Sequence, residues 1–303
     1  MLKLQHIEMI LAIDRAGSIR AASKQLGRTQ PAVTKALRQA EAELGVAIFQ
    51  RAPSGVVATE DGRAVLHRAG VIQAEMRRMQ EEIDQRRGEG TGRITVTVSP
   101  LAANRLIAGA IKRFRKRFPK VHVQITGGHE PIAFGPVRDG VVDLVIGPEP
   151  QGKDVAGLSV AFLVETPVSV ITGESSRWRS CTDLAQLVEG DWLMIGTQAR
   201  LPYLQRHFTS RGLNPPVARV TSESISSVLA MVQDSDFLCT YPGLLLEQTL
   251  AQWRIRALDI RPPIRPARIA ITTASDRPPT PALRCFCDCV SQEAANVFQG
   301  AIP

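Results

Sequence analysis

Long hydrophobic runs are absent from this sequence of 303 residues. A helix that spans a membrane needs about 18 or more consecutive apolar residues, and no segment of the chain approaches that length. Glu8 and Asp14 interrupt the first apolar stretch, which a secretion signal would keep free of charge. We therefore expect a cytoplasmic protein that has no membrane partner.

Cysteine is scarce as well. The five cysteines are an odd number, which fits a reducing compartment better than a disulfide framework. Cys285, Cys287 and Cys289 lie close together, but neither a CxxC pair nor paired histidines complete a tetrahedral metal site. On a helix Cys285 and Cys289 would share a face, and Cys287 would point away. We expect structural thiols, no metal site and no cofactor; a redox role stays open because the thiol pKa decides it.

Catalytic motifs are also missing. The sequence contains no GxGxxG dinucleotide fingerprint, no phosphate-binding loop motif, no HExxH metal motif and no GxSxG nucleophile elbow. Its five histidines are scattered and suggest no triad. We therefore predict that the protein is not an enzyme, and we assign no catalytic residues. An enzyme stays the main alternative function, and a solute-binding protein is the second.

Positive charge is what the chain has in excess. It holds 37 Lys and Arg against 29 Asp and Glu, which gives a formal net charge of +8. Residues 1–58 contain eight basic and four acidic residues, a surplus of four. Clustered cations release counterions from phosphates, so this surplus favours a nucleic acid as the partner.

Apolar residues in the first 59 positions recur at helical spacing in three groups. Ser18 and Thr29 stand where the caps of the second and third helices belong, and Pro31 suits a first helical turn. The connection at 26–29 is short and contains a glycine, which predicts a helix-turn-helix. Two brief apolar runs on either side of Pro53–Gly55 predict a β-hairpin wing.

A long helix is expected next, from Thr59 to about Arg87. Its apolar residues are separated alternately by four and three positions, which is a heptad pattern. This seam consists of Val65, Ala69, Ile72, Met76, Met79 and Ile83. One helix cannot bury such a seam alone, so we predict a coiled coil between two copies of the chain.

The pattern changes after Gly88–Gly92, where short β-branched runs begin to alternate with helical segments. This alternation is typical of an α/β fold with a largely parallel sheet. Strands are expected at 94–98, 121–125 and 141–146, with helices between them, and in a second unit at 168–171, 192–195, 217–220 and 237–240. The run at 269–272 is expected to return to the first unit.

Many residues at fixed spacings mark the first 65 positions or so. They are Gly17–Ala22, Leu26, Thr29–Thr34, Glu41, Leu44–Gly45, Ile48–Phe49, Arg51, Gly55–Val56, Thr59 and Gly62. In these residues the segment closely resembles the signature of the LysR-type transcriptional regulators. Ala40, Ile48 and Ala58 replace leucines that are usual in that signature, which bears on packing more than on contact chemistry.

The resemblance implies a sequence-specific regulator that binds double-stranded promoter DNA as a homodimer. Dimers can pair into a homotetramer in this family, and RNA polymerase is a further candidate partner. Glutamine can make paired contacts with adenine and lysine favours guanine acceptors, so Gln30 and Lys35 suit base readout. The expected DNA-binding residues are Ser18, Thr29, Gln30, Pro31, Thr34, Lys35, Arg38, Arg51 and Pro53. The alternative for any single cation among them is an ordinary solvated charge.

The resemblance also implies the domain organisation, which is α/β overall. A winged helix-turn-helix is expected at 1–58, a linker dimerisation helix and hinge at 59–90, and an effector-binding domain at 91–303. That domain is expected to have two lobes, as periplasmic solute-binding proteins do. Lobe I would comprise about 91–163 and 268–303, and lobe II about 164–267.

One effector position can be argued from chemistry. Ser99 follows the strand expected at 94–98 and begins a helix, a place that favours an anion. The alternative is that Ser99 only caps its helix, and one serine can do both. With the family's cleft, the expected effector-binding residues are Ser99, Pro100, Leu101, Gly128, His129, Pro148, Thr197 and Arg200. Because His129 and Arg200 could balance a negative charge, we expect a small organic acid as the effector.

Overall fold

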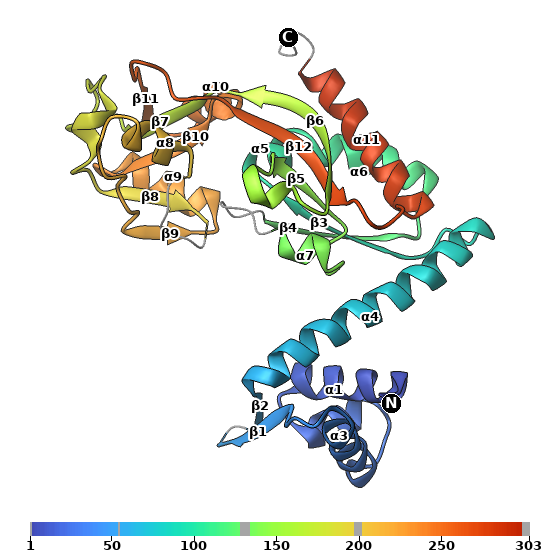
Figure 1. Cartoon of the computed structure of the whole chain (residues 1–303). Helices are drawn as coiled ribbons and strands as arrows, with labels where there is room; N and C mark the ends of the chain where they lie inside the picture. The colour runs from blue at the N-terminus through green and yellow to red at the C-terminus, as the bar shows by residue number, and fades with distance from the viewer. Residues whose placement is uncertain (1, 54, 128–133, 197–201, 299–303) are drawn as a thin grey trace. The chain divides into compact units, whose positions relative to one another are not determined.

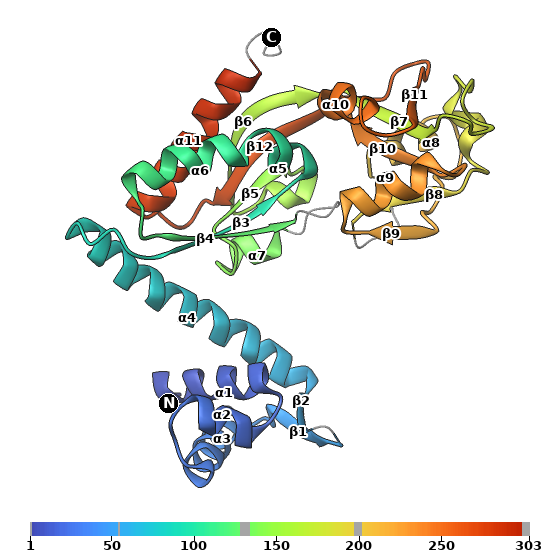
Figure 2. The same ribbon diagram turned by 180° about the vertical axis from the view of Figure 1, so that it is seen from behind.

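The computed structural model describes residues 2–53, 55–127, 134–196 and 202–298. The chain divides into two compact units, one of Met1–Ile83 with Asp139–Val141 and one of Asp84–Arg138 with Val142–Pro303. Figures 1 and 2 show their elements from opposite sides. Among the described residues, none of the helices combines the length and the apolar character that crossing a membrane requires.

Three helices begin the first unit: α1 (Leu4–Ala16), α2 (Ile19–Gln25) and α3 (Gln30–Leu44). Gly17 turns the chain between α1 and α2 at φ 65°, and Ser18 Oγ then accepts a hydrogen bond from Ala21 N at 3.1 Å. The core between the helices contains the fully buried Ile10, Ile13, Ala22, Val33, Ala40 and Ile48. The predicted helix-turn-helix is therefore confirmed.

The wing is an antiparallel hairpin of β1 (Phe49–Ala52) and β2 (Gly55–Ala58). Val56 N donates to Gly17 O at 2.9 Å, which fastens the hairpin to the turn between α1 and α2. Gly55 has φ 137°, and a Cβ added there would collide with Gly17 O. A side chain at position 55 would therefore push the wing away from the helices.

Three further residues of the signature hold the wing and the next helix together. Glu41 Oε1 accepts from Ile48 N at 2.8 Å. Thr59 Oγ1 donates to Ala47 O at 2.6 Å and accepts from Gly62 N at 2.8 Å, so it caps α4 (Glu60–Arg86). A Cβ on Gly62 would collide with Ile48 O. Backbone geometry therefore accounts for the residue type at each of these positions.

Two five-stranded sheets form the second unit (Figures 1 and 2). The first has the order β4-β3-β5-β12-β6 and comprises β3 (Arg93–Val98), β4 (His122–Gly127), β5 (Leu144–Pro148), β6 (Leu158–Thr166) and β12 (Ala267–Ala274). The second has the order β11-β7-β10-β8-β9 and comprises β7 (Val168–Gly173), β8 (Trp192–Ile195), β9 (Val220–Ser222), β10 (Leu238–Pro242) and β11 (Ile255–Leu258). We call the sheets, each with its helices, lobe I and lobe II.

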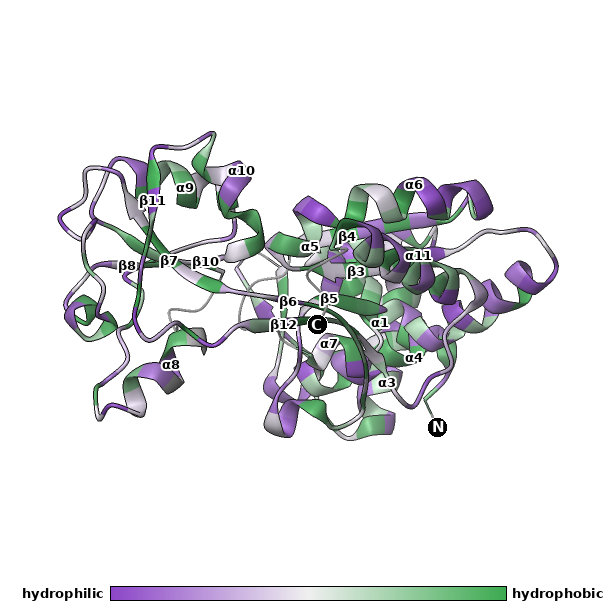
Figure 3. Cartoon of the chain, turned by 90° about the horizontal axis from the view of Figure 1, so that it is seen from above, coloured by the Kyte–Doolittle hydropathy of each residue, from purple (hydrophilic) through white to green (hydrophobic). Residues whose placement is uncertain are grey.

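Helices cover both lobes. Lobe I carries α5 (Pro100–Arg105), α6 (Ile107–Arg117), α7 (Gly135–Arg138) and α11 (Pro281–Val297), and lobe II carries α8 (Pro202–Thr209), α9 (Ile225–Gln233) and α10 (Leu246–Leu250). Short 3₁₀ turns lie at Gly152–Val155, Leu184–Leu187 and Gly243–Leu245. In lobe I, α6 and α11 lie side by side, where Phe114 and Phe286 meet edge to face with ring centroids 5.3 Å apart. The strand β5 beneath them is hydrophobic (Figure 3), and its Leu144 and Ile146 are fully buried.

The expectation of a largely parallel sheet was wrong. In lobe I, β3 is parallel to β4 and β5, but β12 is antiparallel to β5 and β6. In lobe II, β8 is parallel to β9 and β10, but β7 is antiparallel to β10 and β11. The reason is that the chain crosses between the lobes twice, from β6 into β7 and back through β12, without a helix in either crossing. The expected return of 269–272 to the first sheet is confirmed.

Two strands had no counterpart among those expected, β6 and β11. The buried residues of β6 do not alternate with exposed ones, so the period that marks a half-buried strand is missing. The strands expected at 141–146 and 217–220 begin three residues later than expected. The helix expected to end near Gly140 appears as α7, and residues 128–133 before it lie outside the described part of the chain.

The cysteines near the C-terminus lie on α11 as expected, and all three are free thiols. Burial raises the pKa of Cys287 to about 12, and burial together with neighbouring Cys285 raises that of Cys289 to about 11. Both groups are therefore protonated at neutral pH, which is the poorly nucleophilic form. This supports the structural role expected for them.

Gln85, a residue of the second unit, fastens the start of α11. It is only 9% exposed. Its Oε1 accepts from Ala282 N at 3.0 Å, and its Nε2 donates to Thr91 O at 3.1 Å. Ala282 lies in the first turn of α11, and the backbone N–H groups of a first helical turn have no hydrogen-bond partner within the helix.

We expect Gln85→Ala to lower the free energy of unfolding by about 1 to 3 kcal/mol, because the substitution leaves buried backbone groups without partners. Urea denaturation measures this difference. Gln248→Ala is the matched control, since Gln248 is an exposed residue of α10 and its loss should change stability by less than about 0.5 kcal/mol. Equal stability of the two variants would contradict the role of Gln85.

Candidate functional site

The N-terminal half of α3 presents a polar face. Gln30, Pro31, Thr34, Lys35 and Arg38 line one hollow on its surface. The opposite face of the helix is occupied by core residues such as Val33 and Leu37. Packing therefore orients the predicted contact residues of α3 away from the core and toward solvent.

The cations of this face are uncompensated. Lys35 and Arg38 are exposed, and neither forms an ion pair with a residue that the structure describes. Thr29 is the N-cap residue of α3, but its side chain makes no capping hydrogen bond. Its hydroxyl, with the helix N-terminus beside it, is suited to a phosphate oxygen.

Two of the predicted contact residues use their hydroxyl groups within the protein. Thr34 Oγ1 donates to Gln30 O at 2.9 Å, and Ser18 Oγ accepts the hydrogen bond that caps α2. In the wing, Arg51 and Pro53 are exposed, and Arg51 has no ion-pair partner within the described ranges. The structure thus brings Gln30, Lys35 and Arg38 together on one helix and keeps Arg51 on a separate element.

The predicted dimer seam on α4 has two parts. Val65 and Ala69 pack into the core of the first unit, so the chain itself covers them. The other four residues leave large apolar areas in contact with solvent. They are Ile72, Met76, Met79 and Ile83, which are 41%, 43%, 63% and 43% exposed. The seam available to a partner is therefore shorter than the heptad pattern indicates.

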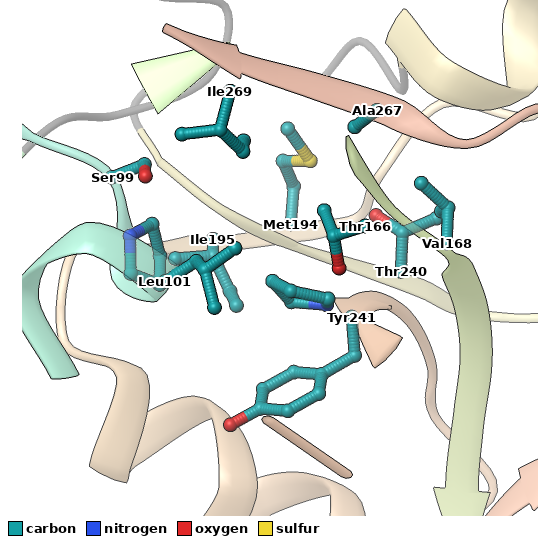
Figure 4. A pocket seen from close by; sticks show the side chains of 12 residues that line it. Ser99, Leu101, Thr166, Val168, Met194, Ile195, Thr240, Tyr241, Ala267 and Ile269 are labelled. Atoms are coloured by element: carbon teal, nitrogen blue, oxygen red, sulfur yellow. The ribbon is translucent and has the colours of Figure 1, made fainter. Parts of the chain in front are cut away.

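A pocket lies between the two lobes, within the second unit (Figure 4). With the open solvent at its mouth included, it holds about 520 Å³ of space not occupied by atoms. It is lined by Ser99, Pro100, Leu101, Thr166, Val168, Met194, Ile195, Thr240, Tyr241, Pro242, Ala267 and Ile269. Both crossings between the lobes contribute to it. We call it the inter-lobe pocket.

Ser99 is held rigidly at one side of this pocket. It is 2% exposed, its N–H donates to Ile146 O at 2.8 Å, and its Oγ accepts from Ala102 N at 3.4 Å. Pro100 has no N–H, and Ala103 N donates to Ser99 O at 2.9 Å. Leu101 N is therefore the one first-turn donor of α5 that lacks a partner among the residues described here. The capping interpretation of Ser99 is confirmed, and its hydroxyl can still donate.

Other polar groups at the pocket are already engaged. Thr166 Oγ1 donates to Pro167 O and accepts from Leu244 N, both within 3.3 Å. The hydroxyl of Tyr241 lies 3.0 Å from Thr249 Oγ1 and points away from the other labelled side chains in Figure 4. Burial raises the pKa of Tyr241, so this hydroxyl stays protonated at neutral pH. The described lining contains no charged side chain.

The predicted effector residues do not all lie at one pocket. Ser99, Pro100 and Leu101 line the inter-lobe pocket, and Pro148 lines a different pocket. Gly128, His129, Thr197 and Arg200 lie outside the described residues. Sequence reasoning missed the apolar wall of the pocket, which includes Val168, Met194, Ile195 and Ile269. These residues belong to strands, and from the sequence alone apolar side chains of a strand are assigned to the hydrophobic core.

Comparison with known proteins agrees with this architecture. A family model described as "Bacterial regulatory helix-turn-helix protein, lysR family" matches residues 4–63. A second, described as "LysR substrate binding domain", matches residues 87–295. Helix-turn-helix, wing and two-lobed domain define a DNA-binding regulator with a ligand-binding module. The chain belongs to the LysR family of bacterial transcriptional regulators.

Individual relatives cover most of the chain. The HTH-type transcriptional regulator TdcA of Escherichia coli K12 is 28% identical over 242 residues, which are 79% of this chain and 77% of TdcA. PcaQ of Agrobacterium fabrum is 22% identical over 302 residues, 99% of this chain and 97% of PcaQ. The crystal structure of full-length CbnR with its target DNA has a TM-score of 0.65 at 20% identity and covers 96% of this chain and 99% of that one. This last likeness shows a shared fold.

Proposed function

We propose that this protein binds specific promoter sequences as a dimer and inserts α3 into the major groove. The observation that carries the proposal is the set of exposed groups on α3, where Gln30 lies beside Lys35 and Arg38 and neither cation has an ion-pair partner in the described chain. Unpaired cations attract phosphates and can displace their counterions. Gln30 and Lys35 can read base edges.

The same proposal includes the domain boundaries and the contact set predicted from the sequence. Residues 1–58 would bind DNA, 59–90 would link and dimerise, and 91–303 would bind the effector. Arg51 of the wing would contact the DNA backbone, since it is exposed on strand β1 of the hairpin. RNA polymerase is a candidate partner of the assembled complex.

The effector is proposed to be a small organic acid in the inter-lobe pocket. Its carboxylate would accept hydrogen bonds from Ser99 Oγ and Leu101 N, and its apolar part would lie against Val168, Met194 and Ile269. A ligand held by both lobes favours the lobe arrangement that it fits best. Its binding would change how the dimer holds DNA, and the ligand would leave the site unaltered.

Ser99→Ala should weaken binding of the effector by about tenfold, the usual effect of losing one good hydrogen bond, while DNA binding without the effector stays normal. Calorimetry with small carboxylic acids and their neutral amides measures the first quantity, and a gel shift measures the second.

Ser224→Ala is the matched control for this prediction, because Ser224 also caps a helix, accepting from Ser227 N at 3.3 Å, but does not line the inter-lobe pocket. The control should bind acids as the wild type does. Tighter binding of neutral amides than of acids, or equal effects of the two substitutions, would count against the proposed site.

A further inference from the structure

A second concave site lies beside β12. It encloses about 1040 Å³ of space outside the atoms and is open to solvent. Its lining is Pro148, Glu149, Gln151, His207, Ser210, Pro263, Arg265, Pro266, Ala267 and Arg268. Pro148 ends lobe I strand β5 and Glu149 follows it, whereas His207 lies in lobe II helix α8 and Ser210 in the turn after that helix. We call it the Arg265 pocket.

The single acidic residue of this described lining is already paired. Arg268 Nε lies 2.5 Å from Glu149 Oε2, and its guanidinium stacks over the ring of Phe162 at 4.3 Å from the centroid. These two contacts fix Arg268 in place. They also neutralise Glu149, so that this carboxylate does not repel an incoming anion.

Arg265 is the remaining cation of the described lining. It is exposed and forms no ion pair or side-chain hydrogen bond with the part of the chain that the structure describes. Pro263 and Pro266 flank it, and their fixed φ angles limit the movement of the backbone that carries it. The backbone at Arg265 is therefore restrained, and no partner in the described chain competes with a ligand for the paired donors of its guanidinium.

Polar groups of other residues line the same pocket. His207 Nε2 is buried and has no hydrogen-bond partner among the residues described. A buried polar nitrogen of this kind is normally satisfied by an ordered water or a ligand. The amide of Gln151 is exposed at the same pocket and can donate as well. The lining thus combines one free positive charge with neutral donors.

We propose that the Arg265 pocket binds a small oxyanion, a phosphate or a carboxylate, at a site separate from the inter-lobe pocket. Paired oxygens on one centre match the planar fork of Arg265. Ala267 lines both pockets, so β12 forms the wall between them. Because residues of both lobes surround the anion, its binding stabilises the arrangement of lobes in which these residues converge.

Calorimetry on the full-length protein, with inorganic phosphate and separately with acetate, tests the proposal. At least one of these anions should bind saturably. Arg265→Ala should weaken that binding by about tenfold or more, and Arg265→Lys should fall between, because it keeps the charge but loses the paired donors. Arg261→Ala is the matched control, since Arg261 is exposed nearby but is paired with Asp259 at 2.6 Å.

The Arg261→Ala variant should bind the anion with an affinity within about twofold of the wild type, because an exposed ion pair contributes little free energy. Equal losses in Arg265→Ala and Arg261→Ala would show a general charge effect and overturn the proposal. No saturable binding of either anion by the wild type, or unchanged binding by Arg265→Ala, would overturn it too. Binding that Arg265→Ala weakens and Ser99→Ala leaves unchanged belongs to this site and not to the inter-lobe pocket, so the two proposals can fail separately.

Discussion

Met76→Glu is expected to convert the protein from a dimer into a monomer. In the proposed coiled coil Met76 lies in the apolar seam of each helix, so the substitution buries two unpaired carboxylates in apolar surroundings. One unpaired buried charge costs about 3 to 5 kcal/mol, so the dissociation constant of the dimer should rise by more than about a hundredfold. Light scattering coupled to size-exclusion chromatography measures the change in mass. The affinity for an operator with two-fold symmetry should fall as the dimer dissociates.

Met76→Leu is the control, because it keeps the volume and the apolar character of the seam. It should remain dimeric. Met76 is 43% exposed in the single chain, so its replacement should not disturb the hydrophobic core of that chain. The fold of the Met76→Glu variant can therefore be checked separately from its oligomeric state. A dimer of normal stability formed by Met76→Glu would show that α4 does not carry the interface.

Gln30→Ala and Lys35→Ala are each expected to reduce binding to the specific operator by about 1 to 3 kcal/mol, the usual value of a base contact. Binding to random DNA should change little in Gln30→Ala, because this residue carries no charge. Fluorescence anisotropy with operator and scrambled duplexes at one fixed salt concentration gives both quantities.

Gln39→Ala is the matched control on the same helix. Gln39 Nε2 donates to Glu43 Oε1 at 3.2 Å, and the residue does not line the hollow of the contact set. Its replacement should leave the ratio of specific to random binding unchanged. The assignment of α3 to base readout fails if both Gln30→Ala and Lys35→Ala keep the discrimination of the wild type.

The starts of helices were predicted well from the sequence. Ser18 and Ser99 cap helices as expected, because each cap needs only a hydroxyl and an N–H three residues later, whereas the Thr29 side chain makes no such hydrogen bond. The heptad seam was predicted less well. Its spacing marks Val65 and Ile72 alike, and only the tertiary structure shows that Val65 is covered within the chain while Ile72 is exposed.

Strand direction and the pocket could not be predicted in the same way. The residues of β12 are apolar whether their neighbours run parallel or antiparallel, so a local pattern carries no information on direction. Met194 and Ile269 lie far apart in the sequence, and their common role appears only when the chain has crossed between the lobes twice. Sequence reasoning placed Ser99 at a ligand site through its helix start, but it had no signal for the apolar wall opposite.

The central claim, that paired α3 helices read a specific sequence, is tested most directly by selecting bound duplexes from a random DNA library with the purified full-length protein. If two α3 helices read the DNA together, one sequence is enriched whose two halves are related by a two-fold axis and are separated by a whole number of helical turns, about 10 base pairs each. Lys35→Ala should lose that enrichment at the positions Lys35 reads. Recovery of unrelated duplexes with no shared sequence, or of a single asymmetric site, would contradict the account.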